Sequence, residues 1–160
     1  MAEIPLTRGL VAIVDDADFD WLNQWRWHAA VSKGAAYGRR ITQADYVVTV
    51  IHMHRVIAGA KPGELIDHKN RNGLDNRRAN LRFATVSQNM QNRRGVGMHG
   101  FRGVSKYHRG SKPWMARGTI GGVYRTLGYY ATPEEAARAH DRAILAEYGE
   151  FAVLNFPEEA

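Results

Sequence analysis

Residues 65–91 read LIDHKNRNGLDNRRANLRFATVSQNMQ, and this stretch decides the fold of the first half of the chain. A short apolar strand leads into Asp67 and His68, and a polar loop of asparagines and arginines follows. Residues 80–83 read as a second strand, and a helix carrying Asn89 in its first turns comes next. The pattern predicts a ββα unit whose three elements converge on one spot.

The residue types at that spot suit phosphodiester hydrolysis. A hard cation takes oxygen ligands, here the Asp67 carboxylate and the Asn89 amide, and stabilises charge on the phosphate and the leaving oxygen. His68, with an ordinary pKa of about 6.5, can take a proton from water near neutral pH. Asn80 is expected to hydrogen-bond the imidazole and so fix its tautomer.

A simpler reading gives these residues structural roles alone. Asp67 and His68 would only end a strand, and the asparagines would serve turns and helix caps. In either reading Leu81 and Phe83 alternate with polar neighbours and are expected to face inward.

The pattern resembles the HNH homing-endonuclease family, in the variant whose last ligand is asparagine. The resemblance covers residues 5–94, and its motifs are Ile4-Pro5-Leu6-Thr7-Arg8-Gly9, Val14-Asp15-Asp16, His54-Arg55 and the block from Asp67 to Asn92. It implies Mg²⁺ or Mn²⁺ bound by Asp67 and Asn89, His68 as general base, Asn80 orienting it, and 5′-phosphate and 3′-hydroxyl products. The candidate DNA contacts in this part are Arg55, Arg93 and Arg94. His54 is expected to pack beside the site and not to bind the metal.

The preceding segment, residues 1–52, is expected to be rich in β-strands. Residues 10–14 and 46–51 are apolar, β-branched runs typical of strands. Between them, a short helix capped by Asp16 is expected to carry Phe19, Leu22 and Trp25 on one face.

The chain has 160 residues and a net charge of +6, and its charged residues are unevenly distributed along the sequence. Residues 66–94 hold seven Lys/Arg and two acids, residues 96–125 hold six Lys/Arg and no acid, and residues 126–160 hold two Lys/Arg and seven acids. Two basic surfaces favour a polyanionic partner, here double-stranded DNA. The chain lacks cysteine and any long apolar run, so we expect a cytoplasmic protein of a bacterial or phage-infected cell, without membrane contact.

The pattern of residues 101–157 predicts a three-stranded antiparallel sheet packed on one helix. Residues 114–120 alternate, Gly121-Gly122 is a two-residue hairpin signal, and residues 123–130 form the return strand. Thr132 begins a helix with proline next and a capping-box glutamate, and Gly149 ends it.

This part is similar to the plant APETALA2/ethylene-response-factor DNA-binding domain. The motifs are Phe101-Arg102-Gly103-Val104, Trp114-x-Ala116, Leu127-Gly128-Tyr129-Tyr130, Glu135-Ala136-Ala137-x-Ala139-His140-Asp141 and Leu154-Asn155-Phe156-Pro157. The resemblance implies that outward residues of the sheet contact bases and phosphates in the major groove. The matching positions are Arg102, Ser105, Tyr107, Arg117, Thr119, Tyr124, Thr126 and Tyr129.

One position departs from the pattern. Arg125 stands at an inward, normally apolar place, opposite Gly118 in the expected hairpin register. We hypothesise that the stem of Arg125 lies across the space that Gly118 leaves.

Together the sequence predicts an α+β protein of two domains. A β-rich HNH endonuclease domain covers residues 1–94, with its ββα-metal core at about 64–94, a glycine-rich linker covers 95–100, and the APETALA2-like domain covers 101–157. The expected activity is metal-dependent, site-specific nicking of DNA by a monomer. The alternative is a DNA-binding regulator without catalytic activity.

Overall fold

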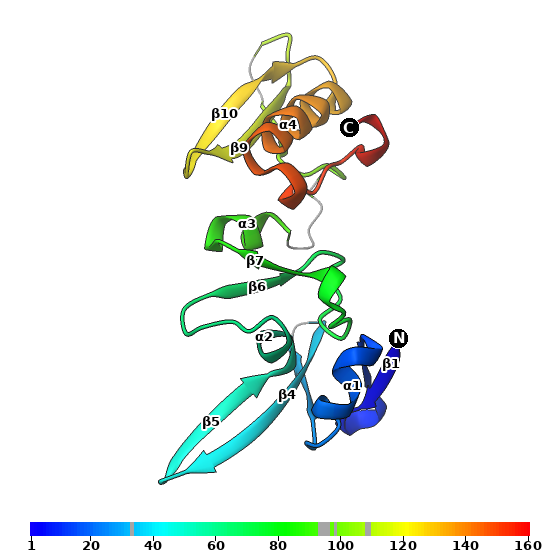
Figure 1. The fold of residues 1–160 in the computed structure, drawn as a ribbon. Helices are drawn as coiled ribbons and strands as arrows, with labels where there is room; N and C mark the ends of the chain where they lie inside the picture. The colour runs from blue at the N-terminus through cyan, green and yellow to red at the C-terminus, as the bar shows by residue number, and fades with distance from the viewer. Residues whose placement is uncertain (33, 93–96, 98, 108–109) are drawn as a thin grey trace. The chain divides into compact units, whose positions relative to one another are not determined.

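The computed structural model describes residues 1–160 except 33, 93–96, 98, 108 and 109. Contacts divide the chain into two compact units, Met1–Thr85 and Val86–Ala160, here called the first and second units. Both combine helices with antiparallel strands, so the predicted α+β class is confirmed (Figure 1). In the described parts of the chain, no helix has the length and apolar character needed to span a bilayer. The domain boundaries at residues 94 and 101 stay predictions.

The first unit is built from small antiparallel sheets and short helices. Its elements are β1 (Ala2–Pro5), β2 (Val11–Val14), α1 (Asp16–Leu22), β3 (His28–Ser32), β4 (Ala35–Ala44), β5 (Val47–His52), α2 (Met53–Ile57), β6 (Leu65–His68) and β7 (Leu81–Ala84). Strand β1 pairs with β2, β4 lies between β3 and β5, and β6 pairs with β7. The expected β-rich character of residues 1–52 is therefore confirmed.

The core of the first unit gathers side chains from the β1–β2 hairpin, α1 and α2. Ile4 and Val14 point into it, and Trp27 completes it with its indole N–H donating to the Leu22 carbonyl at 2.8 Å. The helix expected to present Leu22 and Trp25 together ends at Leu22, so that expectation is wrong for Trp25, which is 36% exposed. Trp27 supplies the buried indole in its place.

Strand β7 shows a second difference from the sequence prediction. Leu81 packs against the core of the first unit, as expected, but Phe83 is 54% exposed. The two side chains share a face of the strand, and only the Leu81 end of that face is covered by the core.

The second unit is a sheet covered by a long helix, with a short helix before it. Its elements are α3 (Val86–Gln91), β8 (Val104–Lys106), β9 (Trp114–Ile120), β10 (Val123–Tyr130) and α4 (Pro133–Tyr148). Strand β9 lies between β8 and β10, and α4 runs across this sheet (Figure 1). The predicted three-stranded antiparallel sheet on one helix is confirmed.

The boundaries of α4 follow from its capping residues. Thr132 accepts a hydrogen bond from the backbone N–H of Glu135, whose carboxylate accepts in return from the Thr132 N–H. Gly149 ends the helix with φ +52°, a conformation that favours glycine. Buried alanines, including Ala136 and Ala137, let α4 approach Ala116 of the sheet closely.

Candidate functional site

Asp67 and His68 end strand β6, and each is 6% exposed. Strand β7 pairs with β6 so that Asp67 lies opposite Arg82 and His68 lies opposite Leu81. Arg82 places Nε 2.9 Å and Nη2 2.8 Å from Oδ2 of Asp67. The buried carboxylate is thus balanced by a buried cation. The sequence reasoning missed Arg82, although the register of the predicted hairpin would have placed it opposite Asp67.

His68 belongs to a group of rings contributed by separate elements of the first unit. Its ring centroid lies 5.0 Å from that of His54 on α2 and 5.8 Å from that of Tyr37 on β4. His52, at the end of β5, lies 5.5 Å from His54. We call His52, His54 and His68 the imidazole group. His54 was expected beside the site, and it lies directly against the predicted base.

Burial controls the charge state of the imidazole group. It lowers the pKa of His54 to about 3, and the neighbouring imidazoles of His68 and His52 act in the same direction. Burial also lowers the pKa of His52. It lowers the pKa of His68 as well, although the Asn76 side chain and the Asp67 charge oppose the shift. All three rings are therefore neutral at pH 7, where each offers one nitrogen as an acceptor.

Asn80 fixes the loop between β6 and β7. Its Oδ1 accepts from the Asn70 backbone N–H at 3.0 Å, and its Nδ2 donates to Oδ1 of Asn70 at 3.0 Å and to the Asp75 carbonyl at 2.7 Å. Asn76 is fully buried, and its Oδ1 lies 3.4 Å from Nε2 of His68. The sequence predicted that Asn80 bonds the imidazole. The structure places Asn76 at the ring and uses Asn80 to hold the loop that carries Asn76.

The same loop is anchored on both sides. Asp75 accepts from Arg77 at 2.8 and 2.6 Å and from the Asn70 amide at 2.8 Å, and the bonds from Arg77 hold the pKa of Asp75 below its usual value. The Asn76 N–H donates to the carbonyl of Ile13 on β2 at 2.7 Å. Because the loop is bonded from within and to β2, Asn76 is held firmly beside His68.

The other residues predicted to bind DNA or metal in the HNH-like part differ in where the structure places them. Arg55 directs its guanidinium to the carbonyls of Lys61, at 2.8 Å, and Glu64, so it closes a turn of the first unit. Its contact with DNA stays a prediction. Asn89 is half-buried on α3, which belongs to the second unit. Two predicted DNA contacts lie outside the described residues: Arg93 and Arg94.

The divalent ion that the sequence implies would need oxygen ligands at this site. In the described parts of the chain, no group of three or more His, Cys, Asp or Glu side chains is arranged to hold a metal. Mg²⁺, however, is commonly bound through one or two carboxylates with substrate phosphates and water completing its shell. The Asp67 carboxylate and the Asn89 amide fit that chemistry, and their joint role stays a prediction.

Most of the predicted DNA contacts of the second unit share the sheet face that points away from α4. Ala116 and Gly118 of β9 face the helix, so Arg117 and Thr119 between them face away. The members of this open face are Ser105, Tyr107, Arg117, Thr119, Tyr124, Thr126 and Tyr129.

Contacts across the strands order the open face. Thr119 lies opposite Tyr124, and the guanidinium of Arg117 lies 5.8 Å from the Tyr124 ring. The rings of Tyr107 and Tyr129 lie 4.8 Å apart. The face therefore offers aromatic, hydroxyl and guanidinium groups, which are suited to base edges and phosphates.

Two of the predicted DNA contacts, Arg102 and Ser105, differ from the others in their surroundings. Arg102 precedes β8, and its Nη2 donates to the carbonyl of Gln91 on α3 at 2.9 Å. The hydroxyl of Ser105 is buried and has no hydrogen-bond partner within the described parts of the chain. Their roles in DNA binding stay predictions.

The hypothesis for Arg125 is wrong in one respect. Arg125 does lie opposite Gly118, as predicted, but its side chain is exposed. A Cβ atom at Gly118 would lie 3.1 Å from Ile144 Cδ1 and 3.3 Å from Leu127 Cδ1, so these side chains fill the space. A register shift between Thr126 and Gly128 accompanies the inward position of Leu127, and this bulge was not predicted from the residue pattern.

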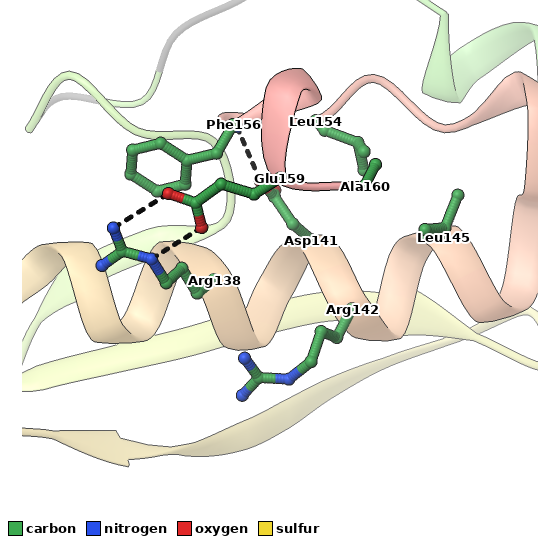
Figure 2. A pocket seen from close by; sticks show the side chains of 8 residues that line it. All are labelled: Arg138, Asp141, Arg142, Leu145, Leu154, Phe156, Glu159 and Ala160. Atoms are coloured by element: carbon green, nitrogen blue, oxygen red, sulfur yellow. Dashed lines mark hydrogen bonds and ion pairs between the residues drawn. The ribbon is translucent and has the colours of Figure 1, made fainter.

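A shallow pocket of about 140 Å³ lies on α4 beside the C-terminal segment. Figure 2 shows Arg138 and Glu159 paired at its edge, with N–O distances of 2.9 and 3.0 Å. Its lining residues are Arg138, Asp141, Arg142, Leu145, Leu154, Phe156, Glu159 and Ala160, none of which belongs to the predicted site.

Comparison with known proteins matches the two parts of the chain to different families. Residues 52–91 match the family model of HNH endonucleases. Over 62 residues the chain is 45% identical to an AP2-like ethylene-responsive transcription factor of Arabidopsis thaliana, covering 38% of this chain and 18% of that protein. The ethylene-responsive transcription factor WRI1 of the same plant is 42% identical over 62 residues, covering 38% and 14%. The chain spans less than a fifth of these relatives, and the matches support an HNH-type and an AP2-type domain.

Proposed function

We propose that this chain is a metal-dependent DNA endonuclease that nicks at a specific site as a monomer. The observation that carries the proposal is the position of His68: it lies within the HNH-matched segment, next to Asp67, in a group of neutral imidazoles. The rival is a DNA-binding regulator that lacks catalytic activity. It gains support from the pairing of Asp67 with Arg82, which offsets the charge that would attract a cation.

His68 is the proposed base that takes a proton from the attacking water. Its lowered pKa keeps the ring unprotonated at neutral pH, as a base requires. The Asn76 amide oxygen, 3.4 Å from Nε2, can accept a hydrogen bond only from the tautomer that carries its hydrogen on Nε2. That tautomer leaves Nδ1 as the basic nitrogen. Asn80 would act indirectly, by holding the loop on which Asn76 lies.

Asp67 and Asn89 are the proposed oxygen ligands of Mg²⁺ or Mn²⁺. Such an ion, when bound, supplies positive charge to the phosphate and the leaving oxygen. Arg82 would keep the Asp67 carboxylate in one orientation through its two contacts. The open face of the sheet would read DNA, since residues 96–125 carry only basic charges while the segment containing α4 is acidic.

The test is cleavage of supercoiled plasmid by the full chain with Mg²⁺, with Mg²⁺ and EDTA, and by the His68→Ala variant. The matched control is His28→Ala, which removes a partly buried imidazole from β3 of the same unit. We expect nicking by wild type and His28→Ala, loss of nicking in EDTA and in His68→Ala, and equal DNA affinity for all three proteins. Cleavage by His68→Ala at the wild-type rate would exclude the base assignment. Metal-independent DNA binding without cleavage by any of them would favour the regulator.

A further inference from the structure

Helix α3 belongs to the HNH-matched segment by sequence, but to the second unit by its contacts. The HNH match runs through residue 91 and so includes all of α3. The contacts of α3, however, place it in the second unit, which begins at Val86. Only Thr85 separates the end of β7 from the start of this helix. The element that carries the proposed ligand Asn89 is therefore packed on the sheet–helix unit that resembles a DNA-binding domain.

The first attachment of α3 runs through Tyr148 of α4. The Tyr148 hydroxyl donates to the carbonyl of Thr119 on β9 at 2.9 Å and lies 3.1 Å from Oγ of Ser87 on α3. A phenol has one hydrogen, so the Ser87 hydroxyl must donate to the Tyr148 oxygen. Tyr148 is only 8% exposed, so water competes weakly for these bonds. A strand of the sheet, α4 and α3 are thus joined at one oxygen atom.

The second attachment lies at the other end of α3. Arg102 donates from Nη2 to the carbonyl of Gln91, the last residue of the helix, at 2.9 Å. The last carbonyls of a helix lack partners within it, and a cation there is favourable. Arg102 is itself fixed, because its backbone N–H donates to Oδ1 of Asn155, whose amide donates to Asp141 of α4.

We propose that Tyr148 is a positioning residue that couples DNA recognition by the sheet to the placement of Asn89. The inference rests on the proposed function. Asn89 lies two residues after Ser87 and two before Gln91, between the two attachments. Thr119, which accepts the Tyr148 hydrogen bond through its carbonyl, carries its side chain on the open face. Ordering of β9 by DNA would therefore be transmitted through Tyr148 to α3.

The first experiment measures hydrogen exchange of the Met90, Gln91 and Asn92 amides in metal-free full chain, with and without random-sequence duplex DNA at low salt. We compare wild type with Tyr148→Phe, which keeps the buried ring and removes the hydroxyl. The control is Tyr130→Phe, which removes the hydroxyl of a partly buried ring that packs against the core of the same unit.

In wild type and in the control, DNA should slow exchange of these amides. In Tyr148→Phe the amides should exchange about fivefold faster without DNA, as expected for the loss of one hydrogen bond, and DNA should protect them less. Equal exchange in Tyr148→Phe and wild type, with and without DNA, would overturn the proposal.

The second experiment titrates Mg²⁺ in plasmid nicking. Tyr148→Phe should need about fivefold more Mg²⁺ for half-maximal rate while its DNA affinity in EDTA is unchanged, and Tyr130→Phe should match wild type. Altered exchange with an unchanged Mg²⁺ midpoint would show that Tyr148 does not position Asn89, and would overturn the proposal. If no protein cleaves DNA, the endonuclease proposal fails and the positioning role fails with it. The exchange data would then still decide whether Tyr148 links α3 to the sheet.

Discussion

Acidification from pH 7 to pH 5 should destabilise the first unit, and His54 should account for a defined part of the loss. Burial holds the pKa of His54 at about 3 in the folded protein, whereas the unfolded chain has an ordinary histidine pKa of about 6.5. Protonation therefore favours the unfolded chain. The stability that His54 contributes is fully present above about pH 6.5 and is lost as the pH falls toward about 3.

The size of the effect follows from the two pKa values. At pH 5 the unfolded chain carries nearly a full proton on His54, and the folded chain carries almost none. Linkage then gives a loss of about 2 kcal/mol between pH 7 and pH 5 from this one residue. His52 and His68, whose pKa values are also lowered by burial, shift stability in the same direction.

The assay compares wild type with His54→Gln, which keeps a polar side chain that does not titrate. Urea unfolding is followed by tryptophan fluorescence in a Trp114→Phe background, because the other tryptophans lie in the first unit. Wild type should lose about 2 kcal/mol more than His54→Gln between pH 7 and pH 5. Equal losses in the two proteins, or a His54 imidazole that titrates near pH 6.5 by NMR, would refute the reasoning.

Two glycines of the second unit give further predictions, both measured by thermal unfolding under circular dichroism. Gly103→Ala should destabilise the unit by about 3 kcal/mol or more, because Gly103 has φ +67° and a Cβ atom there would lie 2.0 Å from Nδ1 of His140. A variant with the wild-type melting temperature would contradict this contact. Gly118→Val should cost about 1–3 kcal/mol by crowding Ile144 and Leu127. An unchanged melting temperature in Gly118→Val would show that the helix-facing side of the sheet has room for the added side chain, and would contradict the prediction.

Local sequence signals predicted the hairpin and the long helix of the second unit well, because each of these elements is specified by neighbouring residues. The hairpin follows from Gly121-Gly122, which both have positive φ, and α4 follows from the capping box at Thr132. The bulge at Leu127 was not predictable, because a register shift depends on how the sheet meets Ile144 of the helix.

The candidate site of the first unit could be predicted in its residue types but less well in its contacts. The spacing of Asp67 and His68 located both at the end of β6. It did not reveal which asparagine lies beside the imidazole. Asn76 and Asn80 belong to the same loop, and the hydrogen bonds within that loop decide that Asn76 contacts His68 while Asn80 bonds to the Asp75 carbonyl. Nor did the spacing reveal the neutral state of His54, which arises from burial contributed by separate strands.

The position of α3 shows the limit of reading a catalytic motif as one local unit. The spacing of a motif indicates which side chains a reaction needs. Packing determines which unit of the protein holds each of them. Here Asn89 follows β7 closely in sequence, yet its helix is bonded to Tyr148, about sixty residues further along the chain. If Asn89 serves the reaction, the unit that we propose contacts DNA also holds part of the catalytic machinery. Cleavage would then respond to substitutions in α4 that touch neither DNA nor the reacting phosphate.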